Sequence, residues 1–255
     1  MRFASIGSGS EGNGLVVEAG TTRVMIDCGF GVRDTAVRLA RIGVMPESLA
    51  AIIVTHEHTD HVGGVPAFAA KHRIPVWLTF GTLEIVGERF AEVERVYGFD
   101  SHDHFAIGDL EVRPFPVPHD AREPVQFVVG DGVFRLGVVT DLGTTTRYVE
   151  VSLSGCDALV LECNHNLDML AQSDYPASLK HRIAGRFGHL DNEGAALLLR
   201  SLDNTRLKHI VAAHLSKQNN TPEMARAALA GALQCSTDWI GVATQAHGFD
   251  WRELS

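Results

Sequence analysis

Short apolar runs rich in β-branched residues alternate along the chain with segments whose apolar positions have helical spacing. Residues 51–54 are apolar throughout, which predicts a strand buried on both faces. Residues 15–20 and 22–29 predict paired strands around a Gly-Thr-Thr turn, and residues 125–130 and 133–139 predict a hairpin at an Asp-Gly turn. Further strands are expected at 75–78, 110–117, 158–161 and 209–213, and helices at 34–42, 62–72, 176–186, 193–202 and 222–233.

Strands and helices in this mixed order, with hairpins as well as crossovers, predict a layered α/β (α+β) fold. No internal repeat, low-complexity tract or Pro/Ser-rich linker interrupts the pattern, so a single domain over residues 1–255 is expected. The acid-rich stretch 84–103 is predicted to be a solvated surface.

The chain has 255 residues, of which 45% are hydrophobic and 21% charged, values typical of a folded globular protein. No apolar run approaches the roughly 20 residues that cross a bilayer, and the first residues lack the apolar block of a signal peptide. We therefore expect a cytoplasmic protein with no membrane partner. The four cysteines form no Cys-x-x-Cys pair and are predicted to be buried free thiols.

Metal-competent side chains crowd the end of the buried strand at 51–54. His56 and His58, two apart on extended backbone, point the same way. Asp60 and His61 come as the chain turns into the next helix, so they can face a second point nearby. Imidazole and carboxylate together suit zinc, iron or manganese, and a rigid sheet can aim such groups at one place. We predict a metal site here.

The segment His-x-His-x-Asp-His after an apolar strand resembles the signature of the metallo-β-lactamase superfamily, and Thr-His-Glu-His-Thr-Asp-His matches it residue for residue. The resemblance implies a four-layer αββα metallo-β-lactamase sandwich with a one- or two-metal site at one edge. It also implies later ligands at strand ends, and His119, Asp141 and His214 each follow an apolar run in the expected order.

The resemblance assigns His56, His58 and His119 to one divalent metal and Asp60, His61 and His214 to another. Asp141 would bridge the two ions, with a shared water or hydroxide between them, and Asp27 would orient the metal loop by hydrogen bonding. The expected cofactors are two Zn²⁺ or Mn²⁺ ions, with Fe²⁺ also compatible.

Further motifs are similar to those of the YycJ/WalJ (VicX-like) branch of that superfamily, over nearly the whole chain. They lie at residues 7–14, 161–165, 188–192 and 214–222, of which His-Leu-Ser-Lys is the most specific. The sequence departs from the branch at Asn166, where Asp is common, and at Asp191, where Ser is common. The loop at 7–14 is either an anion-binding turn or a plain tight turn, and it is not a P-loop.

The branch resemblance implies an enzyme, a 5′→3′ exodeoxyribonuclease-like phosphodiesterase that attacks phosphorus with metal-bound hydroxide, with Asp60 and Asp141 at the catalytic centre. His165 is either a core histidine or the group that protonates the leaving oxygen. The net charge of −9 counts against a wide basic face on duplex DNA but allows a local phosphate site. The candidate substrate-binding residues are Asn164, Lys180, Arg182, Arg186, His189, Ser216, Lys217 and Asn219.

Two other functions are compatible with the same residues. A small-molecule hydrolase, such as a glyoxalase-II-like thioesterase, would use the same ligand set. A non-catalytic scaffold would have no need for all seven ligand positions, which are filled here. Nucleic-acid ends, single-stranded or nicked, are the partner that the branch resemblance implies. The basic residues at 180–186 can also be read as a solvated helix face.

Overall fold

The computed structural model describes all residues 1–255, and two seven-stranded sheets form its centre. The first sheet contains, in spatial order, β14 (Phe249–Glu253), β1 (Arg2–Gly7), β2 (Gly14–Ala19), β3 (Thr22–Ile26), β4 (Ala51–Ile53), β5 (Val76–Thr79) and β6 (Val96–Phe99). The second contains β13 (Gly241–Val242), β12 (His209–Ala213), β11 (Ala158–Glu162), β10 (Arg135–Val139), β9 (Val125–Gly130), β8 (Leu110–Pro116) and β7 (Phe105–Ile107).

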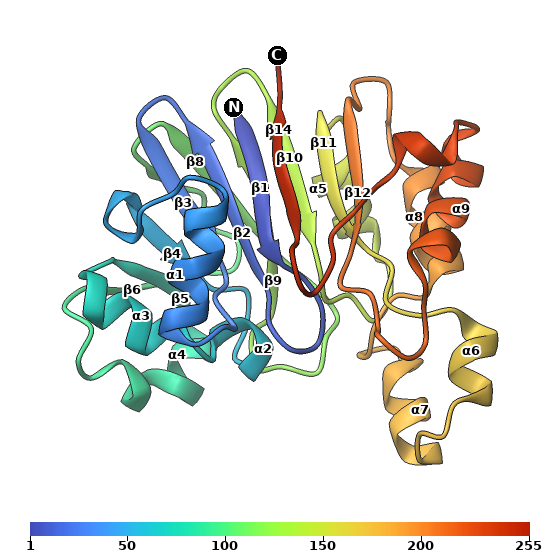
Figure 1. Cartoon of the computed structure of the whole chain (residues 1–255), viewed down its shortest axis with the longest axis horizontal. Coiled ribbons are helices and arrows are strands. Elements are labelled where there is room, and N and C mark those ends of the chain that lie inside the picture. The colour runs from blue at the N-terminus through green and yellow to red at the C-terminus, as the bar shows by residue number, and fades with distance from the viewer.

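Helices cover the outer face of each sheet (Figure 1). The first sheet is covered by α1 (Val32–Arg41), α3 (Val65–His72) and α4 (Phe80–Val86), and α2 (Thr59–Val62) lies at its lower end. The second sheet is covered by α5 (Arg147–Leu153), α8 (Asn192–Ser201) and α9 (Pro222–Leu233). A pair of short helices, α6 (Leu167–Gln172) and α7 (Ala177–Ile183), stands away from both sheets. Short 3-10 turns occupy Pro46–Ser48, Gly87–Phe90 and Thr237–Trp239.

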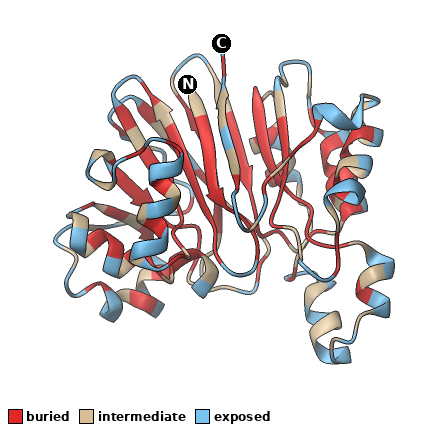
Figure 2. Ribbon diagram, viewed as in Figure 1, coloured by how far each residue is buried: buried red, intermediate tan, exposed pale blue.

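Three apolar clusters hold these layers together. The largest lies between the sheets, where alternate residues of β9, Phe127 and Val129 among them, meet β1 and β3. The neighbouring Val128 points the other way, into the cluster under α8 and α9. Full burial of one such side chain contributes about 1.5–3 kcal/mol. The predicted four-layer αββα sandwich is therefore confirmed, and Figure 2 shows its strands as almost continuously buried.

The apolar strand β4 is buried on both faces, as its sequence predicts. Ile53 belongs to the cluster between the sheets, whereas Ile52 belongs to the cluster under α1 and α3. The strand pair around Gly20 is also confirmed, since β2 and β3 are antiparallel and Ala19 pairs with Thr22. All six acidic residues of the 84–103 stretch are exposed, as expected for a solvated surface.

Some boundaries differ from the prediction. The single helix expected at 62–72 is interrupted at Gly63 and Gly64, since α2 ends at Val62 and α3 begins at Val65. The chain passes close to the loop before α1 at this point. A Cβ on Gly64 would lie 1.8 Å from the carbonyl oxygen of Phe30. The hairpin strand begins at Arg135 instead of residue 133, since the Asp131 carboxylate accepts hydrogen bonds from the amides of Val133 and Phe134 and lengthens the turn.

The helix expected at 176–186 ends at Ile183, shortly before Gly185. Three of the four cysteines, Cys28, Cys156 and Cys163, are buried free thiols, as predicted, and Cys235 is half-buried. Every helix falls short of the length and apolar character that a membrane crossing requires.

Candidate metal centre

The histidines and carboxylates singled out in the sequence converge at one edge of the sandwich. His56 and His58 follow β4 of the first sheet. His119, Asp141 and His214 follow β8, β10 and β12 of the second sheet. These strands run in the same direction within each sheet, so their carboxyl ends meet at the edge where α2 lies. Each sheet therefore supplies part of the site.

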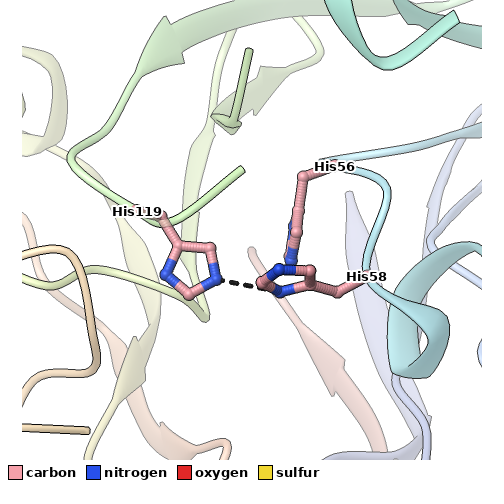
Figure 3. Close-up of side chains that lie close together, drawn as sticks. All are labelled: His56, His58 and His119. Carbon is pink, nitrogen blue, oxygen red and sulfur yellow. Dashed lines mark hydrogen bonds between the residues drawn. The ribbon is translucent and has the colours of Figure 1, made fainter. Parts of the chain in front are cut away.

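His56, His58 and His119 form the first group (Figure 3). The Nε2 atom of His119 lies 3.2 Å from Nδ1 of His58. The remaining nitrogens are held by the surrounding chain: Nδ1 of His119 lies 3.0 Å from the Gly188 carbonyl and Nε2 of His58 3.2 Å from that of Asp120. This arrangement fixes each ring and turns its other nitrogen toward the centre of the group.

Asp60, His61 and His214 form a second group beside the first. One carboxylate oxygen of Asp60, Oδ2, lies 3.4 Å from Nε2 of His61 and 3.3 Å from Nε2 of His214. The side-chain amide of Asn13 lies 3.1 Å from the same nitrogen of His61.

Asp141 lies between the two groups and is buried. Its Oδ2 atom is 3.0 Å from Nε2 of His61, and its Oδ1 atom is 3.7 Å from Nε2 of both His119 and His214. Burial alone would raise the pKa of this carboxyl, but the neighbouring His214 and His61 outweigh it and hold the pKa well below its usual range. The group is therefore an anion that faces imidazoles on both sides.

At the centre, Nε2 of the buried His56 lacks any hydrogen-bond partner, and Oδ2 of Asp141 faces His61 without hydrogen-bond geometry. A buried polar atom left unpartnered costs about 1–3 kcal/mol, so this arrangement is unfavourable without a further group to contact. Imidazole nitrogens and carboxylate oxygens within 4.8 Å of one another form a donor set that a divalent metal ion satisfies. The residues present thus fit a divalent metal site.

The electrostatics of the site differ from one histidine to the next. Burial would lower the pKa of His214, but the carboxylates of Asp141, Asp60 and Glu162 raise it to about 10. The pKa of His61 is likewise raised well above its usual value despite burial, through Asp141, Asp60 and Asp27. Burial and the adjacent His61 instead lower the pKa of His56.

Asp27 connects the first sheet to the metal-competent loop. Its carboxylate accepts hydrogen bonds from the backbone amide and the hydroxyl of Thr55, each at 2.8 Å, and lies 2.8 Å from Nδ1 of His61. Asp27 and His214 both have left-handed backbone, with φ of 61° and 54°. Such conformations are costly for residues other than glycine, and they concentrate at functional sites.

The Gly7–Gly14 loop packs against the second group. Asn13 accepts a hydrogen bond from Gly9 and approaches Asp60, and the hydroxyl of Ser8 accepts one from the His214 amide at 2.9 Å. A Cβ on Gly29 would lie 1.9 Å from the carbonyl oxygen of Asp60, so the chain approaches this residue closely from a second side. Of the two readings of the loop, this contact pattern favours a structural turn.

Glu162 is a site residue that the sequence analysis does not identify. It is fully buried at the end of β11, and its Oε1 atom lies 2.8 Å from Nδ1 of His189. The other oxygen accepts hydrogen bonds from the amides of Leu142 and Leu190. An acidic residue directly after the apolar run 158–161 was the available signal, because a charge is rarely buried without a partner.

His189, expected to bind substrate, lies within the metal-competent set of Asp141, Glu162 and His214. Its side chain is 22% exposed, and Nδ1 lies 3.4 Å from Oδ1 of Asp141. Burial would lower its pKa, but Glu162 and Asp141 raise it.

The other candidate substrate residues separate into two sets. Asn164, Ser216 and Asn219 are buried or half-buried in the segments that follow β11 and β12, and the side-chain amide of Asn164 donates to the His214 carbonyl at 3.0 Å. The basic residues lie farther out: Arg182 donates to Asp120 at 2.6 Å, Lys180 to the Ala171 carbonyl, Lys217 pairs with Glu11, and Arg186 is exposed.

His165 is fully buried, outside every group of metal-competent side chains, and both of its ring nitrogens lack a partner. Asn166 and Asp191, the two departures from the branch pattern, cap helices: Asn166 accepts from the Met169 amide at the start of α6, and Asp191 from the amides of Glu193 and Gly194 at the start of α8. Asp, Asn and Ser are all favourable N-cap residues, so the residue found at each of these two positions still caps its helix.

Comparison with known proteins supports this fold. A family model described as a β-lactamase superfamily domain matches residues 22–214, and the chain belongs to that superfamily. Solved structures share the fold over the full length. YhfI from Bacillus subtilis aligns with a TM-score of 0.76 at 16% identity, covering 99% of each chain. Zn²⁺-bound PqqB from Methylobacterium extorquens aligns with a TM-score of 0.74 at 16% identity, covering 100% of each.

Within the superfamily the chain belongs to the YycJ/WalJ family, which confirms the resemblance found in its motifs. It is 32% identical to exodeoxyribonuclease YycJ of Bacillus anthracis over 252 residues, covering 98% of this chain and 96% of the relative. It is 31% identical to exodeoxyribonuclease WalJ of Streptococcus pneumoniae over 251 residues, covering 95% of this chain and 91% of the relative.

Proposed function

We propose that this protein is a metal-dependent exodeoxyribonuclease that hydrolyses phosphodiester bonds at DNA ends in the 5′→3′ direction. The observation that carries the proposal is Asp141, a buried anion within reach of two imidazole groups, in a chain whose near full-length relatives are named exodeoxyribonucleases. We also propose that residues 1–255 act as one domain, in a reducing compartment such as the cytoplasm that keeps its cysteines free.

The proposed site holds two divalent ions, Zn²⁺ or Mn²⁺ with Fe²⁺ also compatible. His56, His58 and His119 would hold one ion and Asp60, His61 and His214 the other, with Asp141 shared between them. Such a pair supplies Lewis acidity and lowers the pKa of water toward neutrality. Asp27 acts as a positioning residue, because it fixes both Thr55 and His61.

His189 is the proposed proton donor to the leaving oxygen, in preference to His165. Its side chain is partly exposed at the metal groups, whereas the His165 ring is fully buried and could not contact a substrate without moving. Glu162 accepts from Nδ1 of His189, which leaves Nε2 to face the substrate. In the hydrolysis the oxygen of water forms a bond to phosphorus, the bond between phosphorus and the departing oxygen breaks, and that oxygen receives a proton from His189.

The test is a time course on end-labelled single- and double-stranded DNA and RNA with Zn²⁺, Mn²⁺ or Mg²⁺ added. We expect mononucleotides to be released from the 5′ end of DNA. Asp141→Ala should reduce the rate by at least about 100-fold while circular dichroism remains unchanged. Wild-type activity in that variant would refute the proposal.

A thioester assay distinguishes the proposed nuclease from the other enzyme class, a small-molecule hydrolase. Thioester cleavage that excess oligonucleotide leaves unaffected, together with no DNA hydrolysis, would show a small-molecule hydrolase of this fold.

A further inference from the structure

A pocket of about 240 Å³ lies directly beside the metal centre, between the α6–α7 pair and the Gly7–Gly14 loop. Asp120 and His189 form its boundary with the metal groups, and Ser10 lines it from the loop. On the other side it is lined by Tyr175, which precedes α7, and by one face of that helix. None of these helix residues belongs to the metal groups.

The α7 wall combines apolar and cationic character. Leu179, Arg182 and Ile183 are spaced as i, i+3 and i+4, which places them on one helix face. Arg182 uses Nε to donate to Asp120 at 2.6 Å, and its two terminal amino groups have no partner within the chain. An aromatic ring, two aliphatic side chains and a free guanidinium fork are the groups that contact a base, a sugar and a phosphate.

The size and position of the pocket suit a single nucleotide of a nucleic acid. Its volume is below the roughly 300–1,000 Å³ of typical small-molecule sites, so it suits a single nucleotide better than a stacked run. It is also lined by His189, the proposed proton donor. The part of the substrate that departs with the protonated oxygen must lie on that side.

We infer that this pocket binds the terminal nucleotide of the DNA strand, with its base against Tyr175 and its phosphate at Arg182. The inference rests on the proposed function and deepens it, since a one-nucleotide pocket beside the cutting centre makes the enzyme act at ends. Tyr175 is then a residue that selects the substrate end and has no part in the chemistry.

The test compares Tyr175→Ala with Tyr175→Phe on two oligonucleotides, one with a normal 5′-terminal nucleotide and one whose terminal sugar lacks its base. Stacking on one aromatic side chain corresponds to roughly ten-fold in affinity. We therefore expect Tyr175→Ala to raise KM about ten-fold for the normal end only, with kcat nearly unchanged. Tyr175→Phe should behave as wild type. Tyr148→Ala, at a 46% exposed tyrosine on α5 outside the pocket, is the matched control.

Binding of the product provides a readout that does not need turnover. Calorimetry with deoxyadenosine 5′-monophosphate and with 2-deoxyribose 5-phosphate should show the base-containing ligand bound more tightly by wild type, and Tyr175→Ala should remove the difference. If wild type hydrolyses no DNA, the proposed function fails, while this binding difference still decides the pocket. Equal binding of both ligands by wild type, or an equal rise in KM on both oligonucleotides in Tyr175→Ala, would overturn the inference.

Discussion

Oε1 of Glu162 lies 2.8 Å from Nδ1 of His189, and this contact joins the end of β11 to the loop before α8. The carboxylate is fully buried, whereas the imidazole is partly exposed. Glu162 therefore holds one ring nitrogen, Nδ1, and leaves the other, Nε2, for a substrate.

Glu162→Gln should impair proton donation without removing the metal ions. Because Glu162 raises the pKa of His189 against the effect of burial, its loss lowers that pKa. The protonated imidazole is then lost at lower pH, so the alkaline limb of the kcat profile should move to lower pH and kcat should fall about 100-fold. Rates measured across pH, beside metal content by mass spectrometry, check this. An unchanged profile would show that His189 is not the donor.

Metal uptake at pH 7 should release protons. In the metal-free protein the neighbouring carboxylates raise the pKa of His61 and raise that of His214 to about 10, so the His214 ring carries a proton at neutral pH. An ion binds only the deprotonated ring, and its affinity should therefore increase with pH up to about pH 10. Calorimetry in buffers of different ionisation enthalpy measures the release. Uptake without proton release would contradict the electrostatics described for the site.

Gly29→Ala should weaken metal binding, because the added Cβ would lie 1.9 Å from the Asp60 carbonyl and displace the turn that carries Asp60. We expect metal content below that of wild type and activity lower by about ten-fold or more. Gly31→Ala is the matched control, since a Cβ there meets nothing within 4 Å. Equal metal content in the two variants would show that this close approach is not needed.

Phe127→Ala should destabilise the fold by about 3–5 kcal/mol, since the ring is fully buried between the sheets and its removal leaves a cavity. Chemical denaturation measures the change. Val133→Ala, at a side chain 66% exposed, should alter the free energy of unfolding by less than about 0.5 kcal/mol. Similar losses in both variants would mean that the inter-sheet cluster does not dominate stability.

Sequence patterns were most informative where a long apolar run ended in a polar group. The strands at β4, β8, β10 and β12 and the residues after them could be found in this way, since a short apolar run rich in β-branched residues indicates a buried strand. Short elements such as α4, α5 and α6 were missed because six or seven residues hold too few turns for a helical period to show.

The contacts inside the site were not available from the chain alone. Glu162 and His189 are 27 residues apart, and the fold brings them together through a loop that also donates the Leu190 amide to Glu162. Arg182 and Asp120 are even farther apart, by 62 residues. The run of basic residues could therefore be noticed in the sequence, but not divided into those at the pocket and those facing solvent.

Because the candidate coordinating groups are divided between two sheets, a bound metal would join the two halves of the sandwich. His56 and His58 sit on one half and His119 and His214 on the other, so neither half alone presents a complete cage. A small shift of one sheet relative to the other, even one caused by a substitution deep in the interior, would move the coordinating side chains apart. Loss of ions should therefore be the earliest sign of damage in this molecule, ahead of any melting of its strands.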